Sequence, residues 1–294
     1  MTRVVGVHGI GNYRPGESAR EAAVRLAAIW DTALDRGHTA AGHDGPARRA
    51  PRDMRVAYYA DLLHAAGRQS GPADLESLDG FERELLDAWL AELPLPGNTA
   101  AGRATWAPRQ AVSWLARTRF PGRTVTEWFV ATFVREVATY LRADAGVRDA
   151  VRDHVARVID EHRADVVIAH SLGSVVAYEA LWRHQHLTVP SLITLGSPLA
   201  LPHAVLHRLD PAPVPSGAPG SSGLPQGARP PGVRHWTNLA DPGDIVAIPP
   251  RGVGRHFDRV DVDEHTVINA FDFHTVRNYL ASPLVARALL WETG

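Results

Sequence analysis

The segment from Asp165 to Ser174 constrains the fold more than any other part of the chain. It reads Asp-Val-Val-Ile-Ala-His-Ser-Leu-Gly-Ser. A short apolar run bounded in this way is typical of a buried strand, and the glycine after the serine opens a helix. We therefore expect a strand, a very tight turn that presents Ser171, and a helix over 172–184. Serine placed there would lie at the carboxyl edge of a parallel sheet, where open α/β folds bind their ligands.

The turn itself indicates a nucleophile. Its pattern is G-x-S-x-G with Ala169 in place of the first glycine, His170 and Leu172 as the variable residues, and Gly173 closing it. Small residues are needed two positions before and after Ser171, because larger side chains would collide with the neighbouring strand or helix. The free N–H groups of the helix N-terminus also favour negative charge beside the serine. The alternative is a serine that only caps the helix.

The N-terminal strand, expected over 3–7, ends in a second informative turn. The turn reads His8-Gly9-Ile10-Gly11. Its glycines let the backbone bend so that amides point toward Ser171, which predicts an oxyanion hole built from the N–H groups of Ile10 and Leu172, with Gly11 as a further candidate. The alternative is an ordinary glycine-rich turn or a phosphate loop. The spacing matches neither nucleotide-binding glycine pattern, and the chain has no lysine.

Further strands and helices alternate along the chain, which predicts an α/β fold with a mostly parallel sheet and helices on both faces. We expect one domain over residues 1–294. The expected strands cover 54–60, 165–169, 191–195, 233–240 and 255–262; the expected helices include 19–36 with Gly37 as C-cap, 81–93, one starting in a capping box of Thr124 and Glu127, 147–159 and 274–291. Residues of about 70–120 should form an inserted helical cap. The proline- and glycine-rich stretch 211–232 should be a flexible loop.

These segments together resemble the α/β-hydrolase superfamily, in particular its lipases and esterases. Leu195-Gly196-Ser197-Pro198 is similar to a turn that follows the next strand in lipases. Within the superfamily the chain looks most like bacterial hydrolases akin to the GPI inositol-deacylases. The resemblance covers the sheet but not the cap, and it implies that the catalytic residues follow in the order Ser, acid, His.

That order directs the search for the acid and the base to later segments. Asp244 in Asp-Ile-Val is similar to the lipase acid, and Asp241, which directly follows the strand 233–240, is the alternative acid. His274 is similar to the lipase histidine that precedes a terminal helix bearing a tyrosine. His256 and His265 are the other candidates. We expect Ser171, His274 and Asp244 to form a triad, supported by His8, Gly9, Gly11, His170 and Gly173.

Composition excludes several other classes. The chain carries 31 basic and 32 acidic residues, and this balance argues against a nucleic-acid partner. It has no cysteine, so it has no disulfide and no thiolate ligand. Charged residues interrupt every apolar run, so we expect no transmembrane segment, and the N-terminus lacks the features of a signal peptide, which suggests a cytoplasmic location.

The expected function is that of a serine hydrolase that cleaves an ester-type acyl bond through an acyl-enzyme. We expect it to need no metal and no organic cofactor. Its substrate would be a small-molecule or lipid-like acyl compound, because Trp114, Trp128, Phe129 and Phe133 lie in helices near the cap. The sequence identifies no protein partner. The alternatives are an acyltransferase or thioesterase with the same triad, and a non-catalytic interaction or effector module on this fold.

Overall fold

The computed structural model describes most of the chain. The described residues are 1–42, 51–66, 75–93, 108–118, 123–142, 146–215, 225–266, 268 and 274–290. Parts of the expected cap (70–74, 94–107 and 119–120) and of the expected loop (216–224) therefore lie outside the described residues.

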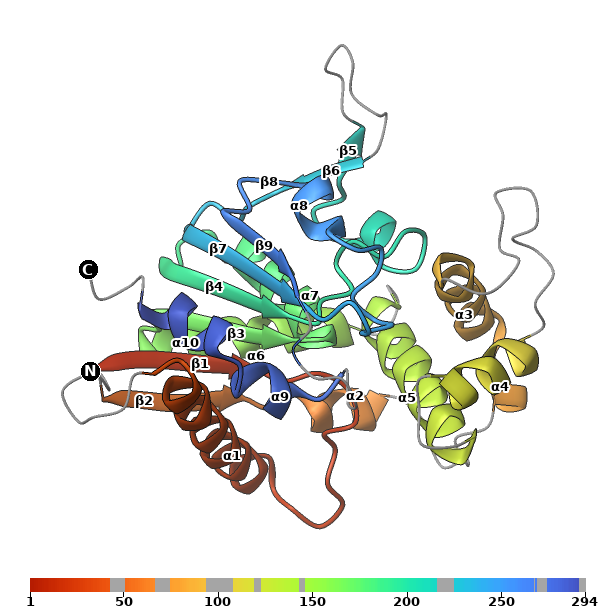
Figure 1. Cartoon of the computed structure of the whole chain (residues 1–294), viewed down its shortest axis with the longest axis horizontal. Helices are drawn as coiled ribbons and strands as arrows, with labels where there is room; N and C mark the ends of the chain where they lie inside the picture. Colours follow the sequence, from red (N-terminus) through yellow and green to blue (C-terminus); the bar gives the residue numbers. More distant parts are fainter. Residues whose placement is uncertain are drawn as a thin grey trace.

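A six-stranded sheet forms the centre of the molecule (Figure 1). Its strands, in spatial order, are β2 (Arg52–Ala57), β1 (Thr2–Val7), β3 (Val166–His170), β4 (Val189–Leu195), β7 (Val233–Ala240) and β9 (Val262–His265). All neighbouring pairs are parallel. Val7 of β1 pairs with Ala169 of β3, so the turns that follow these two strands leave the sheet at the same level.

Helices cover both faces of this sheet, because alternate residues of its strands are apolar on each side. Val167 packs into a core with α6 (Val147–His162) and α7 (Leu172–Arg183). Ile168 points to the opposite face, against α1 (Ala19–Ala40), α9 (Val276–Leu280) and α10 (Pro283–Leu290). The prediction of an α/β fold with a mostly parallel sheet is confirmed.

Additional helices lie beyond the carboxyl ends of the strands, at the right of Figure 1. They are α3 (Gly80–Glu92), α4 (Pro108–Thr118) and α5 (Arg123–Leu141), preceded by α2 (Ala60–Ala66) and the short helix η1 (Leu75–Ser77). The helical group extends past the expected limit of residue 120, since α5 packs on both α3 and α4. Its buried residues belong to the same core as α6 and α7.

Several predicted element boundaries are wrong. Gly37 lies inside α1, which continues to Ala40; a Cβ at Gly37 would be 2.6 Å from the carbonyl oxygen of Leu280, so this glycine serves helix packing. Thr124 lies within α5 and does not cap it; among the described helix starts, capping boxes are formed by Ser18 with Glu21 and by Asp79 with Glu82.

The C-terminal third also differs from the expectation. The stretch 255–262 contains the end of α8 (Gly252–His256), the two-residue strand β8 (Phe257–Asp258) and only the first residue of β9. The expected helix 274–291 is two helices, α9 and α10, because Pro283 cannot donate a backbone hydrogen bond and starts a new helix.

The proline-rich stretch 211–232 contains more regular structure than expected. Strands β5 (Val214–Pro215) and β6 (Pro225–Ala228) pair in antiparallel fashion, and β6 pairs with β8. Between β4 and β5 the only helix among the described residues is η2 (Leu206–Arg208).

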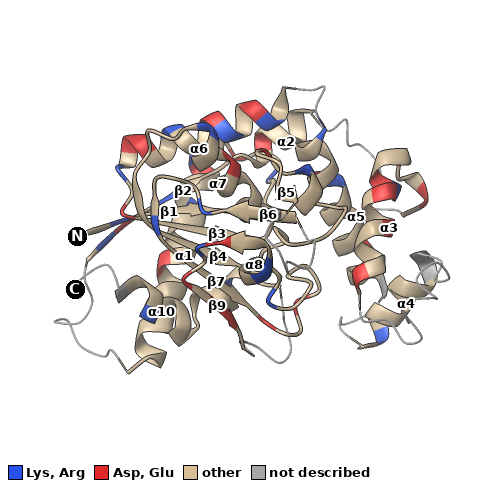
Figure 2. Ribbon diagram, turned by 90° about the horizontal axis from the view of Figure 1, so that it is seen from above, with Lys and Arg blue, Asp and Glu red and all other residues tan. Residues whose placement is uncertain are grey.

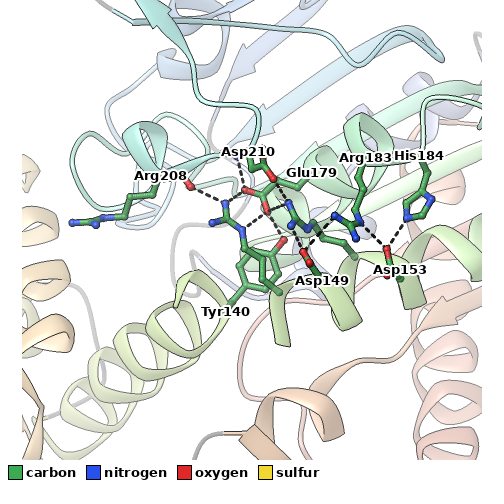
Figure 3. Close-up of polar contacts among 10 residues, drawn as sticks. Tyr140, Asp149, Asp153, Glu179, Arg183, His184, Arg208 and Asp210 are labelled. Atoms are coloured by element: carbon green, nitrogen blue, oxygen red, sulfur yellow. Dashed lines mark hydrogen bonds and ion pairs between the residues drawn. The ribbon is translucent and has the colours of Figure 1, made fainter. Parts of the chain in front are cut away.

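A buried charge network fixes α7, the helix that follows Ser171 (Figure 3). The Glu179 carboxylate of α7 is fully buried and accepts hydrogen bonds from the Tyr140 hydroxyl of α5, from Arg148 of α6 and from the backbone N–H of Asp210. Arg152 of α6 adds an ion pair. Because each carboxylate oxygen has several donors, the network joins α5, α6 and α7 without leaving a buried charge unpaired.

Basic and acidic residues are interspersed along α6, as Figure 2 shows. This matches the formal net charge of −1. Among the described helices, none combines the length and the hydropathy needed to cross a lipid bilayer.

Candidate active site

Ser171 occupies a strained turn between β3 and α7. Its backbone has φ 54° and ψ −130°, a conformation that costs a non-glycine residue about 1–3 kcal/mol. A Cβ at Gly173 would lie 2.3 Å from the carbonyl oxygen of Val7 and 2.4 Å from that of His8. Glycine is therefore required there for α7 to approach the end of β1. The strain and the close approach together direct Ser171 toward the carboxyl edge of the sheet.

Three side chains from separate segments form a continuous hydrogen-bonded chain at this edge. The Ser171 hydroxyl lies 2.9 Å from His274 Nε2. His274 Nδ1 lies 2.9 and 2.8 Å from the two carboxylate oxygens of Asp244. With the proton on Nδ1, donated to Asp244, the lone pair on Nε2 faces the serine hydroxyl. This arrangement allows His274 to accept the Ser171 proton.

The Asp244 carboxylate is held by its own loop. Its Oδ1 accepts from the N–H groups of Val246 at 2.9 Å and Ala247 at 3.4 Å, and its Oδ2 accepts from the Tyr279 hydroxyl at 2.8 Å. Burial and the nearby Asp244 raise the pKa of Tyr279 well above its usual range, so this phenol keeps its proton and remains a donor. Gly196 makes room for the pair, since a Cβ there would lie 2.6 Å from Asp244 Oδ2.

Asp241, the alternative acid, is used differently. Its Oδ1 accepts from the N–H of Gly243 at 2.7 Å, and its Oδ2 accepts from the N–H of Ile268 at 2.6 Å. Its backbone N–H donates to the Tyr279 hydroxyl. Asp241 thus shapes the turn that carries Asp244. Of the alternative bases, His256 hydrogen-bonds the carbonyl oxygen of Pro225, and His265 ends β9.

The turn after β1 lies against the serine. A Cβ at Gly9 would lie 2.6 Å from the Cβ of Ser171, so only glycine allows this approach. Among the described residues, the backbone N–H groups of Ile10 and Leu172 have no hydrogen-bond acceptor. These are the two groups predicted to bind an oxyanion. The N–H of Gly11, the third candidate, is occupied: it donates to Glu136 Oε1 at 3.0 Å.

Three carbonyl groups of this turn, those of His8, Gly9 and Ile10, accept hydrogen bonds. His8 Nδ1 donates to the carbonyl oxygen of Gly9 at 2.8 Å, and Asn12 Nδ2 donates to those of Gly9 and Ile10, both at 3.0 Å. The Tyr59 hydroxyl donates to the carbonyl oxygen of His8 at 2.6 Å. Because these carbonyl groups are hydrogen-bonded, the peptide planes that carry them cannot rotate freely. We infer that these contacts direct the N–H of Ile10.

His8 supports the turn as a neutral ring. The N–H of Tyr59 donates to its Nε2 at 3.1 Å, and the ring stacks on that of Tyr59 with centroids 4.2 Å apart. Burial lowers the pKa of His8 to about 4. It therefore stays uncharged at neutral pH, where its Nδ1 proton is the one that holds Gly9.

His170 packs beneath the candidate base. Its ring centroid lies 4.8 Å from that of His274 and 5.9 Å from that of Tyr279. Burial, together with the nearby His274, lowers the pKa of His170 well below its usual range. Its Nε2 is buried without a hydrogen-bond partner among the described residues. His170 thus contributes an uncharged surface that supports His274.

Helices α3 and α5 contact the site directly. The rings of Phe129 on α5 and His274 pack edge to face, with centroids 5.5 Å apart. Trp128 is 52% exposed, and its indole would be 3.4 Å from a Cβ at Gly11. On α3, Trp89 is fully buried and its indole N–H donates to the carbonyl oxygen of Ile245, beside Asp244, at 2.8 Å. Aromatic side chains of these helices therefore contact the base and the loop that carries the acid.

Sequence reasoning missed Asn12, Tyr59 and Glu136. Asn12 directly follows the glycine turn, and a short polar side chain there is a recognisable signal, because such residues often bind nearby backbone groups. Tyr59 lies within the strand expected over 54–60, but β2 ends at Ala57, so in the structure Tyr59 follows the strand at the same sheet edge. Glu136 lies on α5, 125 residues from its partner Gly11, and no local pattern indicates that contact.

In the part of the chain that the structure describes, His, Asp and Glu side chains nowhere gather into a group of three or more suited to a metal ion. The chain matches no model of a known protein family and no curated protein sequence. The geometry of the site is thus the basis for assigning a function.

Proposed function

We propose that this chain is a serine hydrolase of the α/β-hydrolase type that cleaves ester-like acyl bonds. The observation that carries the proposal is the 2.9 Å contact between Ser171 Oγ and His274 Nε2, with Asp244 behind the imidazole. The parallel sheet with helices on both faces, and the strained serine at a strand-to-helix turn, are compatible with that superfamily.

The reaction uses each of these side chains. His274 removes the Ser171 proton as Oγ attacks the acyl carbonyl, and the carbonyl oxygen becomes an oxyanion that accepts from the N–H groups of Ile10 and Leu172. The imidazolium then protonates the departing alcohol oxygen, which leaves an acyl-Ser171 ester. Water attacks this ester with His274 again as base, and Ser171 regains its proton as the carboxylic acid is released. Asp244 stabilises the imidazolium throughout.

The substrate class follows from what surrounds the serine. Phe129 contacts the base, and the half-exposed Trp128 covers Gly11. These aromatic surfaces favour an apolar acyl or alcohol group, as in a lipid-like ester. An acyltransferase or thioesterase would use the same three residues with another acceptor or leaving group. Product analysis with added alcohols or amines, compared with water alone, distinguishes these reactions.

A fluorophosphonate tests the proposal, because it phosphonylates only an activated serine. We expect one adduct per chain, mapped by mass spectrometry to the peptide that contains Ser171. The adduct should be lost in Ser171→Ala and should form much more slowly in His274→Ala. Ser174→Ala is the matched control, since Ser174 lies on the same turn but hydrogen-bonds Ser197 and the carbonyl oxygen of Ser171. Absence of an adduct in the folded wild type would favour a non-catalytic module.

A further inference from the structure

Helix α5 holds the candidate oxyanion turn through one carboxylate. Glu136 Oε1 accepts the hydrogen bond from the N–H of Gly11 at 3.0 Å. Phe129, seven residues earlier and so on the same side of the helix, packs edge to face with the His274 ring. One helix thus reaches both halves of the site. The Phe129 contact is apolar, whereas the Glu136 contact fixes a backbone group.

Glu136 holds the Ile10–Gly11 peptide. The preceding peptide bears the Ile10 N–H, which is the proposed oxyanion donor. The Ile10–Gly11 peptide is held at both ends: its carbonyl oxygen accepts from Asn12 Nδ2, and its N–H donates to Glu136. The preceding peptide, which bears the Ile10 N–H, is held through the Gly9 carbonyl by His8 and Asn12. Because both flanking peptides are fixed, Ile10 cannot rotate. Gly11 has φ +70°, so without Glu136 this flexible residue could release the second peptide.

A glutamate at position 136 lowers the stability of the folded chain. Burial raises the pKa of its carboxyl to about 7, which the hydrogen bond from Gly11 opposes. Among the described residues no arginine or histidine forms an ion pair with it within 4.0 Å. A partly buried carboxylate without a cation lowers stability, and residues of this kind concentrate at functional sites. A glutamine would accept the same hydrogen bond without that cost.

We propose that Glu136 is a positioning residue: through the Gly11 peptide it holds the Ile10 N–H in the direction in which it binds the oxyanion. The inference rests on the proposed hydrolase function. It assigns to α5 a part in the reaction beyond covering the site. Glu136 itself does not touch the reacting atoms.

The test is the second-order rate of phosphonylation of the full chain by a fluorophosphonate, together with kcat and KM for a p-nitrophenyl ester. Glu136→Met keeps the length of the side chain but removes the acceptor, and Glu136→Gln keeps an acceptor oxygen. Glu161→Gln, an exposed change on α6 that removes only an ion pair with Arg157, is the matched control. Thermal melting at pH 8 is recorded for each variant.

We expect Glu136→Met to lower both kcat and the phosphonylation rate about 10–100-fold, less than the about 10²–10³-fold for complete loss of an oxyanion donor, with KM nearly unchanged. Its melting temperature should not fall, because a desolvated carboxylate is removed. Glu136→Gln should recover the rate to within about threefold of wild type, and Glu161→Gln should match wild type.

A Glu136→Met rate within tenfold of wild type, or a Glu136→Gln variant as slow as Glu136→Met, overturns the inference. If Glu136→Met does not fold, Glu136→Asp, whose carboxylate is about 1.5 Å too short, replaces it under the same criterion. The two proposals fail in different ways: if the wild type is not labelled, or Ser171→Ala still is, the hydrolase function itself is wrong.

Discussion

Replacing Asp244 by asparagine should abolish activity through the tautomer of His274. Oδ1 of Asp244 faces the N–H groups of Val246 and Ala247, so the amide oxygen of the introduced asparagine will occupy that position. The amide nitrogen then takes the place of Oδ2, which lies 2.8 Å from His274 Nδ1. Because this nitrogen donates, it favours the tautomer in which Nδ1 accepts and the imidazole proton lies on Nε2, in competition with the amide oxygen 2.9 Å from Nδ1. Nε2 can then no longer accept the Ser171 proton.

The magnitude follows from that blocked step. An asparagine in place of a triad aspartate lowers kcat by about 10⁴, or about 5.5 kcal/mol of transition-state stabilisation. The assay is kcat/KM for hydrolysis of a p-nitrophenyl ester at pH 8, with circular dichroism to confirm folding. KM should change little, because Asp244 is buried and does not contact substrate.

Asp241→Asn is the matched control. Asp241 accepts from two backbone N–H groups, of Gly243 and Ile268, and asparagine can satisfy only one of them with its oxygen. We expect a loss of about 1–3 kcal/mol in the free energy of unfolding, with kcat/KM reduced far less than in Asp244→Asn. A rate loss of similar size in Asp241→Asn, or near-normal activity in Asp244→Asn, would refute the assignment of the acid.

Three further predictions concern stability. Gly173→Ala should lower the free energy of unfolding by about 3 kcal/mol or more in urea titrations, because the new Cβ would lie 2.3 Å from the carbonyl oxygen of Val7; a wild-type midpoint would contradict the close approach. Glu136→Gln should stabilise the chain by up to about 3 kcal/mol at pH 8 but not near pH 4.5. The substitution stabilises at high pH because the folded-state pKa of Glu136 is about 7, above the usual 4.5, so the ionised carboxylate lowers the free energy of unfolding as pH rises through this window. An equal effect at both pH values would exclude ionisation of Glu136 as the cause. Glu179→Gln should cost about 3–5 kcal/mol, because it leaves Arg148 without its buried partner, whereas Glu161→Gln, at the exposed ion pair with Arg157, should cost less than about 1 kcal/mol.

The sheet was predictable because its strands are buried on both faces. The run Val166–His170 is apolar up to its last residue, and Val233–Ala240 is buried over its last five residues; the bounds of both in the structure lie within a residue or two of those expected. The wrong element boundaries lie where tertiary contacts determine the local structure. Gly37 stays inside a helix because Leu280 packs against it, and the stretch after Pro250 becomes α8 rather than a strand.

The three side chains that meet at the site were also selected from sequence, since the local turn pattern identifies Ser171 and the order Ser, acid, His limits the rest. The choice between Asp244 and Asp241 could not be derived from spacing, because both lie in the same turn. It depends on which carboxylate faces His274, and thus on Gly196 leaving space for it. The contact of Glu136 with Gly11 depends on how α5 packs over the sheet edge, which no sequence pattern encodes locally. The catalytic roles of all these residues remain predictions.

The most direct measurement is a search for the covalent intermediate. A reaction with a slowly hydrolysed p-nitrophenyl ester, quenched in acid within the first turnovers, is digested and analysed by mass spectrometry. We predict an acyl group on the peptide that contains Ser171, formed in step with a burst of nitrophenol. Turnover without an acylated Ser171 peptide, or an acyl group on another residue, would contradict the account.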